Sequence, residues 1–156
     1  MPEISPASPA DDDRFAIVVA QWNADVTEKL LQGALETFAS AGVGSDRVDV
    51  ARVPGSWELP LVAQRFARSG QYAAVICLGA VIQGETTHDE HINRTVCLAM
   101  SDIALASDVP VLLGLLTCYT MQQALDRSGG RVGNKGSECA EASLQMVGLL
   151  KRLPQV

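Results

Sequence analysis

The sequence predicts an α/β fold: a three-layer αβα sandwich in which helices cover both faces of a four-stranded parallel sheet. Strand-like apolar runs alternate four times with segments of helical periodicity. Two of these runs, 15–20 and 73–78, are apolar without interruption, which is typical of parallel strands covered on both faces. The length of 156 residues, with 47% hydrophobic and 19% charged side chains, suits one globular domain.

The amino-terminal part holds a tail and the first strand–helix unit. Residues 1–13 contain three prolines and three consecutive aspartates, so we expect a disordered or loosely docked tail ahead of a single domain at 14–156. The apolar run at 15–20 predicts the first strand. Apolar side chains at helical spacing over 26–38 predict the first helix, and Gly42 is a residue type that commonly closes one.

The next two units repeat this pattern. A strand is predicted at 48–53 and a helix at 57–68. Pro60 is compatible with this helix because it falls in the first turn, where proline is tolerated. The third strand is predicted at 73–78, and a loop at 79–87 follows it.

The carboxy-terminal part completes the alternation. An apolar stripe at helical spacing predicts a long helix at about 88–106, and the fourth strand is expected at 110–117. A short helix at 121–127, a glycine-rich loop at 129–136 and a last helix at 137–150 follow.

Composition disfavours several classes of protein. The net charge of -6 lacks the basic footprint of a nucleic-acid-binding protein. No apolar run approaches the roughly 20 residues of a membrane helix, and the first residues do not resemble a signal peptide, so we expect a cytoplasmic protein. The cysteines at 77, 97, 118 and 139 form no CxxC pair and are expected to be reduced, buried apolar side chains.

Ligands of a parallel sheet bind beyond the carboxyl ends of its strands. The four loops at that edge begin at Gln21, Pro54, Gly79 and Thr117. In the third loop, Thr86 with Asp89 and Thr87 with Glu90 each fit a helix capping box. The N–H groups of this helix start could bind an anion, or the segment could simply be a well-capped helix.

His88 stands at the same helix start, and a histidine there can trade protons near neutral pH. Together with His91 it could instead share a metal ion. The chain has no third histidine and no cysteine pair to complete a zinc set, so a metal site is not expected.

Cations and aromatic side chains occupy the other loops. Arg127 could bind phosphate through two hydrogen bonds, or complement the dipole at a helix end. The glycine-rich loop at 129–136 is not a Walker motif, because Asn134 stands where glycine should precede Lys135. Trp22 could stack on a planar ligand. The residues alone therefore indicate a site for a planar polar ring and an anion, with one histidine to move protons.

Ser56, Trp57 and Glu58 offer a hydroxyl and a carboxylate suited to a polyhydroxy chain. The alternative is that Trp57 packs in a core or subunit contact and that Glu58 complements a helix start.

Five collinear segments resemble the 6,7-dimethyl-8-ribityllumazine synthase family, also called the riboflavin synthase beta-chain family. They are VPGSWELP at 53–60, GAVIQGETTH at 79–88, GLLT at 114–117, QALDR at 123–127 and GNKG at 133–136. The resemblance runs from about Phe15 to Leu150 and implies a flavodoxin-like fold. It also implies the condensation of 5-amino-6-(D-ribitylamino)uracil with 3,4-dihydroxy-2-butanone 4-phosphate, which releases water and phosphate.

The resemblance assigns roles to the matching positions. His88 would carry protons, and the phosphate substrate would meet Glu85, Thr86 and Arg127. The uracil substrate and its ribityl chain would be bound by Trp22, Ser56, Trp57, Glu58, Ala80, Val81, Ile82, Leu113 and Lys135. Trp22 would stack on the ring, and the backbone of 80–82 would meet the pyrimidine. In the family the site lies between adjacent subunits of a pentamer, and a pentamer, a decamer or a 60-subunit shell is implied here.

Three positions depart from the family pattern. Asp89 stands where an aromatic residue usually follows the histidine, which makes the surroundings of His88 more negative. His91 is an addition, and Leu113 replaces a phenylalanine that often reaches the neighbouring subunit's site. These departures leave open a relative that binds the ligands without turnover, or a purely structural assembly protein.

Overall fold

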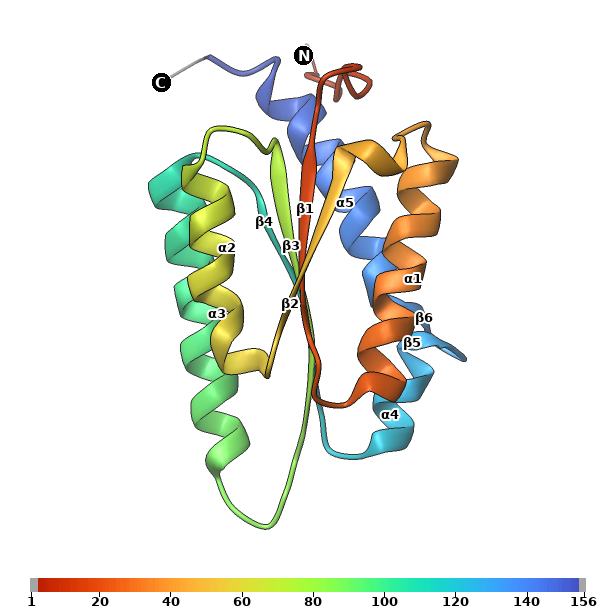
Figure 1. Ribbon diagram of the computed structural model, residues 1–156, viewed down its shortest axis with the longest axis vertical. Coiled ribbons are helices and arrows are strands. Elements are labelled where there is room, and N and C mark those ends of the chain that lie inside the picture. Colours follow the sequence, from red (N-terminus) through yellow and green to blue (C-terminus); the bar gives the residue numbers. More distant parts are fainter. Residues whose placement is uncertain (1–2, 155–156) are drawn as a thin grey trace.

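The computed structural model describes residues 3–154 and has the predicted architecture (Figure 1). The strands of the main sheet are β1 (Phe15–Ala20), β2 (Val48–Val53), β3 (Ala74–Ile82) and β4 (Val111–Cys118). The α-helices are α1 (Ala24–Ser40), α2 (Leu59–Arg68), α3 (His88–Ser107), α4 (Met121–Asp126) and α5 (Lys135–Leu150). A small hairpin consists of β5 (Ser128–Gly130) and β6 (Gly133–Asn134), and 3-10 turns are formed by Ser45–Arg47 and Ser56–Glu58.

The main sheet is parallel, with strand order β2-β1-β3-β4. Helices α2 and α3 cover one face, and α1, α4 and α5 lie on the other (Figure 1). The predicted three-layer αβα sandwich is thus confirmed, and every predicted strand and helix is present within a few residues of its expected bounds.

The position of β1 between the two helical layers explains why its sequence is apolar throughout. Phe15, Ile17 and Val19 belong to the core beneath α1 and α5, whereas alternate residues of the same strand belong to the core beneath α2 and α3. All six side chains of β1 are buried. A strand with both faces covered has no solvent-facing side, so the polar alternation of a one-sided sheet is lost.

The structure differs from the prediction at the end of β3. Residues 79–82 were expected in a loop but continue the strand, because β4 pairs with them in register from Gly79↔Leu115 to Ile82↔Cys118. On its other edge β3 pairs with β1 only as far as Leu78. The last residues of β3 therefore have a strand neighbour on one side only.

The last helix starts earlier than predicted. Asn134 caps α5 through its side-chain oxygen, which accepts hydrogen bonds from Gly136 N at 2.8 Å and Ser137 N at 3.2 Å, so the helix starts at Lys135 rather than 137. The glycine-rich segment ahead of it forms the β5–β6 hairpin instead of a plain loop. Gly42 follows the end of α1 with φ of 81°, as expected for a glycine that closes a helix.

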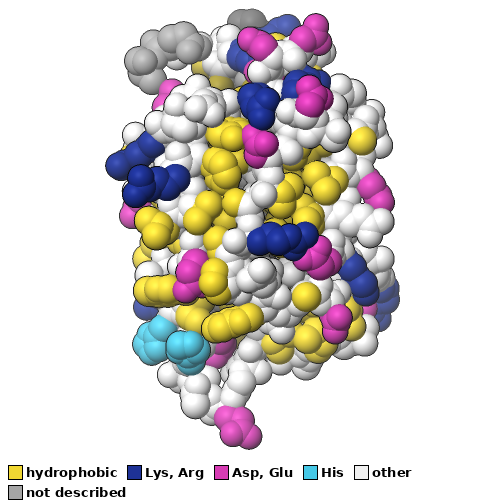
Figure 2. Space-filling model, in the orientation of Figure 1, with side chains coloured by type: hydrophobic (Ala, Val, Ile, Leu, Met, Phe, Trp, Pro, Cys, Tyr) yellow, Lys and Arg dark blue, Asp and Glu magenta, His cyan; other side chains and the backbone are white. Residues whose placement is uncertain are grey.

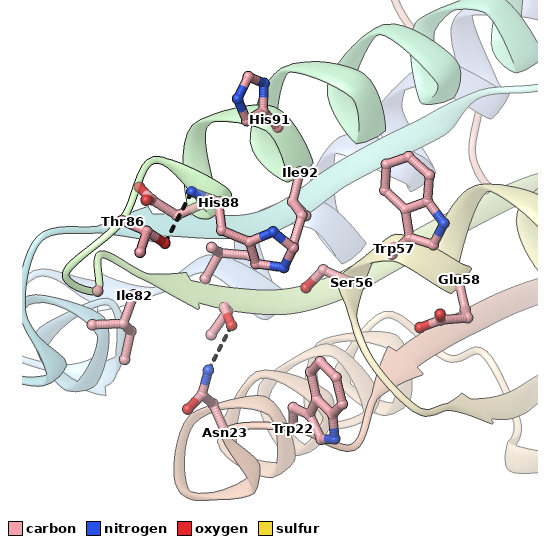
Figure 3. A pocket seen from close by; sticks show the side chains of 14 residues that line it. Trp22, Asn23, Ser56, Trp57, Glu58, Ile82, Thr86, His88, His91 and Ile92 are labelled. Carbon is pink, nitrogen blue, oxygen red and sulfur yellow. Dashed lines mark hydrogen bonds between the residues drawn. The ribbon is translucent and has the colours of Figure 1, made fainter.

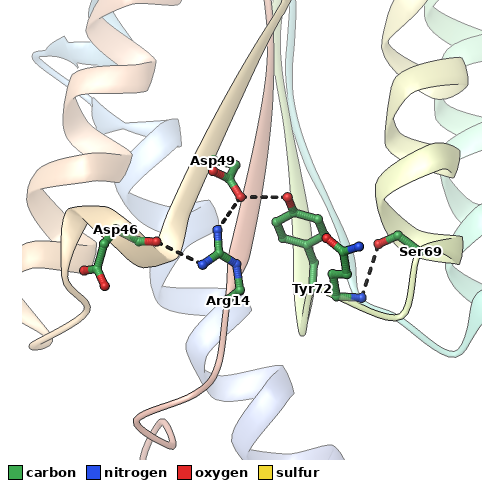
Figure 4. Close-up of polar contacts among 6 residues, drawn as sticks. Arg14, Asp46, Asp49, Ser69 and Tyr72 are labelled. Atoms are coloured by element: carbon green, nitrogen blue, oxygen red, sulfur yellow. Dashed lines mark hydrogen bonds and ion pairs between the residues drawn. The ribbon is translucent and has the colours of Figure 1, made fainter.

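The amino ends of the strands are closed by paired polar groups (Figure 4). Asp49 accepts hydrogen bonds from the Tyr72 hydroxyl and from Arg14 Nη2, each at 2.7 Å. These two donors lower the pKa of Asp49, the tyrosine contributing most. Arg14 Nη1 also donates to Asp46 O at 3.1 Å.

The described part of the amino-terminal segment lies beside the end of α5. Ala7 N donates to Gly148 O at 2.9 Å, and Lys151 Nζ contacts both carboxylate oxygens of Asp13 at 2.6 Å. Asp13 is buried, and its carboxylate also accepts from Ala10 N at 2.7 Å. Both contacts lie at the end of the sheet where the strands begin.

Candidate functional site

A cavity of about 680 Å³ lies at the carboxyl ends of β1, β2 and β3, beside the start of α3. It is lined by Trp22, Asn23, Ser56, Trp57, Glu58, Ala80, Val81, Ile82, Gly84, Thr86, His88, Asp89, His91 and Ile92. Most of the residues singled out from the sequence are therefore brought together in one cavity, at the edge where a parallel sheet is expected to bind ligands.

The turn after β1 places the first tryptophan at the mouth of this cavity. Trp22 N donates to Pro54 O at 3.1 Å, which ties the turn to the loop after β2. The indole is 68% exposed and lies against Gly55, where an added Cβ would come within 2.9 Å of the ring. Glycine at this position therefore allows the indole to approach the neighbouring backbone closely.

Asn23 is a lining residue that the sequence prediction missed. It adopts a left-handed conformation with φ of 59°, which asparagine tolerates better than most residues. Its side-chain nitrogen donates to Ala80 O at 2.7 Å (Figure 3). This bond occupies one carbonyl on the edge of β3 that β1 no longer covers.

The 3-10 turn Ser56–Glu58 forms another wall. Glu58 Oε2 accepts from Gly55 N at 3.0 Å, which holds the turn closed, and Trp57 is 56% exposed. Ser56 is buried against β3, where a Cβ on Gly79 would come within 2.7 Å of the serine oxygen. The absence of a side chain at Gly79 therefore makes room for this hydroxyl.

His88 is exposed at the first position of α3, and its ring points toward Ser56 (Figure 3). His91 also lines the cavity, but in Figure 3 its ring points away from that of His88. Figure 2 shows the histidine side chains side by side on the surface at this end of the molecule. The imidazole of His88 is thus open both to the cavity and to water.

The two predicted capping boxes at the start of α3 are wrong. Thr87 is the N-cap, but its side chain makes no capping bond, and the Thr86 hydroxyl accepts weakly from His88 N at 3.4 Å. Side-chain capping needs an extended N-cap residue, whereas Thr87 has φ of -83° and ψ of 13°. The start of α3 therefore keeps backbone N–H groups that a bound anion could use.

Several predicted residues do not line this cavity. Glu85 is exposed in the loop between two lining residues, Gly84 and Thr86. Leu113, on the edge strand β4, is 45% exposed. Arg127 ends α4 and donates from Nη1 to Gln123 O at 3.2 Å, and Lys135 begins α5 with Nζ 2.9 Å from Glu138 Oε2.

The predicted site residues of one chain thus form two groups. One lines the strand-end cavity, with Glu85 in the loop beside it, and the other consists of Leu113 on β4, Arg127 at the end of α4 and Lys135 at the start of α5. The bond from Arg127 to a carbonyl of its own short helix matches the alternative in which it complements the helix end. The contact with Glu138 raises the pKa of Lys135, which keeps this amine charged.

The cysteines are free, as expected from their spacing. Cys77 and Cys139 are buried, and Cys97 and Cys118 are partly exposed. Burial raises the pKa of each thiol, that of Cys139 to about 11. These thiols are therefore poor nucleophiles at neutral pH.

Metal-binding clusters and membrane-spanning helices are both absent from the described part of the chain. Within residues 3–154, no group of three or more histidine, cysteine, aspartate or glutamate side chains is arranged to hold a metal ion. Among the same residues, no helix has the length and apolar character that crossing a membrane requires.

Comparison with known proteins agrees with the family resemblance seen in the sequence. The sequence model of the family described as 6,7-dimethyl-8-ribityllumazine synthase matches residues 12–151. Proteins of that name from Xanthomonas euvesicatoria pv. vesicatoria (strain 85-10) and Xanthomonas oryzae pv. oryzae (strain PXO99A) are each 46% identical over 141 residues, which cover 90% of this chain and 92% of theirs. The protein of the same name from Xanthomonas campestris pv. campestris (strain B100) is 45% identical with the same coverage.

Among solved structures, SulA from Pseudomonas aeruginosa covers 70% of this chain and 75% of its own length, with a TM-score of 0.43 and 13% identity. This likeness is too distant to inform function.

Proposed function

The chain belongs to the 6,7-dimethyl-8-ribityllumazine synthase family, and on this basis we propose how its strand-end cavity serves the family's reaction. It is a transferase of riboflavin biosynthesis that condenses 5-amino-6-(D-ribitylamino)uracil with 3,4-dihydroxy-2-butanone 4-phosphate to 6,7-dimethyl-8-ribityllumazine. The observation that carries the assignment of the site is the gathering of Trp22, Ser56, Trp57 and His88 in one cavity at the carboxyl edge of the sheet.

The uracil ring is bound between Trp22 and the end of β3. The exposed indole supplies a flat apolar surface for stacking. Beyond Leu78 the edge of β3 that faces β1 has no strand partner, and Asn23 already bonds the Ala80 carbonyl there, so the backbone groups of the segment 80–82 that stay unpaired can meet the polar edge of the pyrimidine. Ser56, Trp57 and Glu58 hold the ribityl chain beside it.

The phosphate of the second substrate binds at the start of α3. The uncapped N–H groups near Glu85 and Thr86, together with the helix dipole, favour a bound anion. They also stabilise the charge that develops when phosphate leaves. Arg127, taken from a neighbouring copy of the chain, adds the cation.

His88 moves the protons of the reaction. The 5-amino group of the uracil attacks the ketone, water leaves as an imine forms, and phosphate is then eliminated after a proton is removed from carbon. The nitrogen that carries the ribityl chain then attacks the neighbouring carbonyl carbon, and loss of a second water closes the lumazine ring. An imidazole open to the cavity suits this proton removal. Holding both substrates in one cavity lowers the entropic cost of their meeting.

The complete site is shared between adjacent copies. Leu113, Arg127 and Lys135 lie outside the cavity of their own chain, so they serve the cavity of a neighbour. Exposed apolar side chains outside the cavity, including Leu61, Leu98 and Leu105, are suited to burial between copies in a homopentamer. A decamer or a 60-subunit shell built from pentamers would use the same contacts.

We further place this enzyme in the cytoplasm, as one domain at 14–156 with a tail at 1–13, needing no metal or organic cofactor. Light scattering on the native particle measures the assembly size. A monomer would contradict the shared site.

The test of the function is direct. Purified protein mixed with the two substrates should produce the absorbance of the lumazine, with phosphate released in equal amount. Ligand binding without product would instead favour a binding protein. Neither binding nor product would leave a structural assembly protein.

A further inference from the structure

The side chain of Asn23 makes a contact that its place at a helix start does not explain. Asn23 is the N-cap residue of α1, and asparagine is among the best capping residues, yet its side chain makes no capping hydrogen bond. The side-chain nitrogen instead donates to Ala80 O at 2.7 Å (Figure 3). This side chain therefore serves the end of β3 rather than the start of α1.

The contact occurs where β3 loses a strand neighbour. β1 pairs with β3 only as far as Val19↔Leu78, and the chain then turns towards β2, where Gln21 N donates to Val53 O at 2.8 Å. Beyond this point one edge of β3 has no strand beside it. The carboxamide of Asn23, in the turn after β1, takes the place of the missing strand.

The alternation of a parallel strand shows which backbone groups lie on the open edge. In such a strand the N–H and C=O of one residue point to one neighbour, and those of the next residue point to the other. Val75 N and Gln83 N both donate to carbonyl groups on the β4 side. Because the register between them is continuous, Ala80 and Ile82 direct their backbone groups to the side that β1 has left. Both residues line the cavity.

Asn23 is the residue that restrains this open edge. The segment 80–82 is bonded to β4 on its other side, and the loop 83–87 that follows it is exposed. A bond to Ala80 O fixes the peptide groups of the segment in one orientation before a ligand arrives. Groups that are already ordered need not be ordered on binding, and this lowers the free-energy cost of recognition.

We infer that Asn23 is a positioning residue, which fixes the backbone of 80–82 to bind the uracil ring at the edge where an N–H stands between two carbonyl groups. The inference rests on the proposed function and deepens it, because it identifies a residue outside β3 that makes the ring recognition specific. In the proposed function the phosphate substrate binds at the start of α3, on another wall of the cavity. Asn23 should therefore affect the binding of one substrate only.

The left-handed backbone of Asn23 decides which variants are informative. Asn23→Gly removes the carboxamide and keeps the backbone conformation, because glycine adopts a positive φ at little cost. Asn23→Asp keeps the size of the side chain but replaces the N–H donor by an oxygen, which the Ala80 carbonyl repels. Asp108 also has a positive φ, of 55°, at the end of α3 and outside the cavity. Asp108→Gly is therefore the matched control.

Binding can be measured without turnover, because Trp22 and Trp57 line the cavity and their fluorescence reports occupancy. Dissociation constants are measured for the uracil substrate alone and for its N3-methyl derivative, in which a methyl group blocks the ring edge. In Asn23→Gly, affinity for the uracil substrate should fall by about 3- to 10-fold, as for a lost neutral hydrogen bond. Affinity for the N3-methyl derivative should stay nearly unchanged, and Asp108→Gly should change neither constant.

Asn23→Asp should lose at least as much affinity for the uracil substrate as Asn23→Gly, and either variant that folds suffices for the comparison. In steady-state assays, both should raise the KM for the uracil and leave the KM for the phosphate substrate nearly unchanged. Equal losses of affinity for the uracil and for its N3-methyl derivative would overturn the inference and leave Asn23 a structural residue of its turn. Unchanged affinity for both compounds would overturn it as well.

Failure of the proposed function gives a different result. A wild type that binds the uracil but forms no lumazine would overturn that function, and the comparison of the two ligands would still decide the role of Asn23. A wild type that binds neither compound would overturn both.

Discussion

The two ends of the parallel sheet differ in how many of their polar groups have partners within the chain. At the amino ends, Asp49 is bonded to Arg14 and Tyr72, and Asp13 is paired with Lys151. At the carboxyl ends, two indoles are more than half exposed, and the edge of β3 runs beyond β1.

This difference separates stability from function. Polar groups that find partners within the chain support the fold, whereas groups left without partners are available to a ligand. The carboxyl end is held by the buried strands and by a few bonds of its own, such as that from Asn23 to Ala80 O, so its exposed side chains are positioned without being paired themselves. Substitutions at the carboxyl end should therefore change turnover, and substitutions at the amino end should change stability.

The largest effect is expected for His88→Ala. The lumazine-forming rate should fall by about 10- to 10,000-fold, because a general acid–base group is lost. The exposed side chain contributes little to the fold, so the midpoint of thermal unfolding should stay close to that of the wild type. Stopped assays of lumazine absorbance and a calorimetric scan measure the two quantities. An undiminished rate would remove His88 from the reaction.

A smaller and more selective effect is expected for Arg127→Ala. The KM for the phosphate substrate should rise by about 10- to 100-fold, in keeping with the loss of a hydrogen bond between two charged groups. The KM for the uracil should change little. Steady-state kinetics with each substrate varied in turn provide the test. Equal increases in both constants would assign Arg127 to the end of α4 rather than to the phosphate.

The smallest effect is expected at the other end of the sheet, for Asp49→Asn. The pKa of Asp49 is lowered in the folded protein, so its contribution to stability is present above the unfolded carboxyl pKa of about 3.9 and is lost as the pH falls through the folded pKa. The variant should be slightly less stable than the wild type at pH 7, and this deficit should vanish in acid.

Urea unfolding at pH 7 and pH 2.5 checks this, at low salt because the Arg14–Asp49 pair is partly exposed. The lumazine-forming rate of Asp49→Asn should match that of the wild type. A deficit that persists unchanged in acid, or a slower reaction at neutral pH, would show that the two ends are not independent.

The architecture could be predicted because its signals are local. The unbroken apolar run of β1 and the helical spacing of α1 each reflect burial within a short segment. The extension of β3 to Ile82 could not be predicted in the same way. It depends on pairing with β4, and the glycine at 79 reads locally as the start of a loop.

The site was predicted in composition and only partly in geometry. The loops named most of the residues that line the cavity but missed Asn23, and this partial success arises because parallel strands bring their carboxyl ends to one edge. The prediction of capping boxes at Thr86 and Thr87 was wrong because a sequence pattern does not fix φ and ψ. The left-handed backbone of Asn23 and its bond to Ala80 O depend on packing that no local pattern encodes.

The most direct test of the shared site mixes two damaged chains in one particle. His88→Ala and Arg127→Ala chains, each nearly inactive alone at low phosphate-substrate concentration, are unfolded together and refolded as a mixture. If neighbouring copies complete each cavity, about a quarter of the sites should join an intact His88 to an intact Arg127 and regain activity. A mixture no more active than its components would contradict the account.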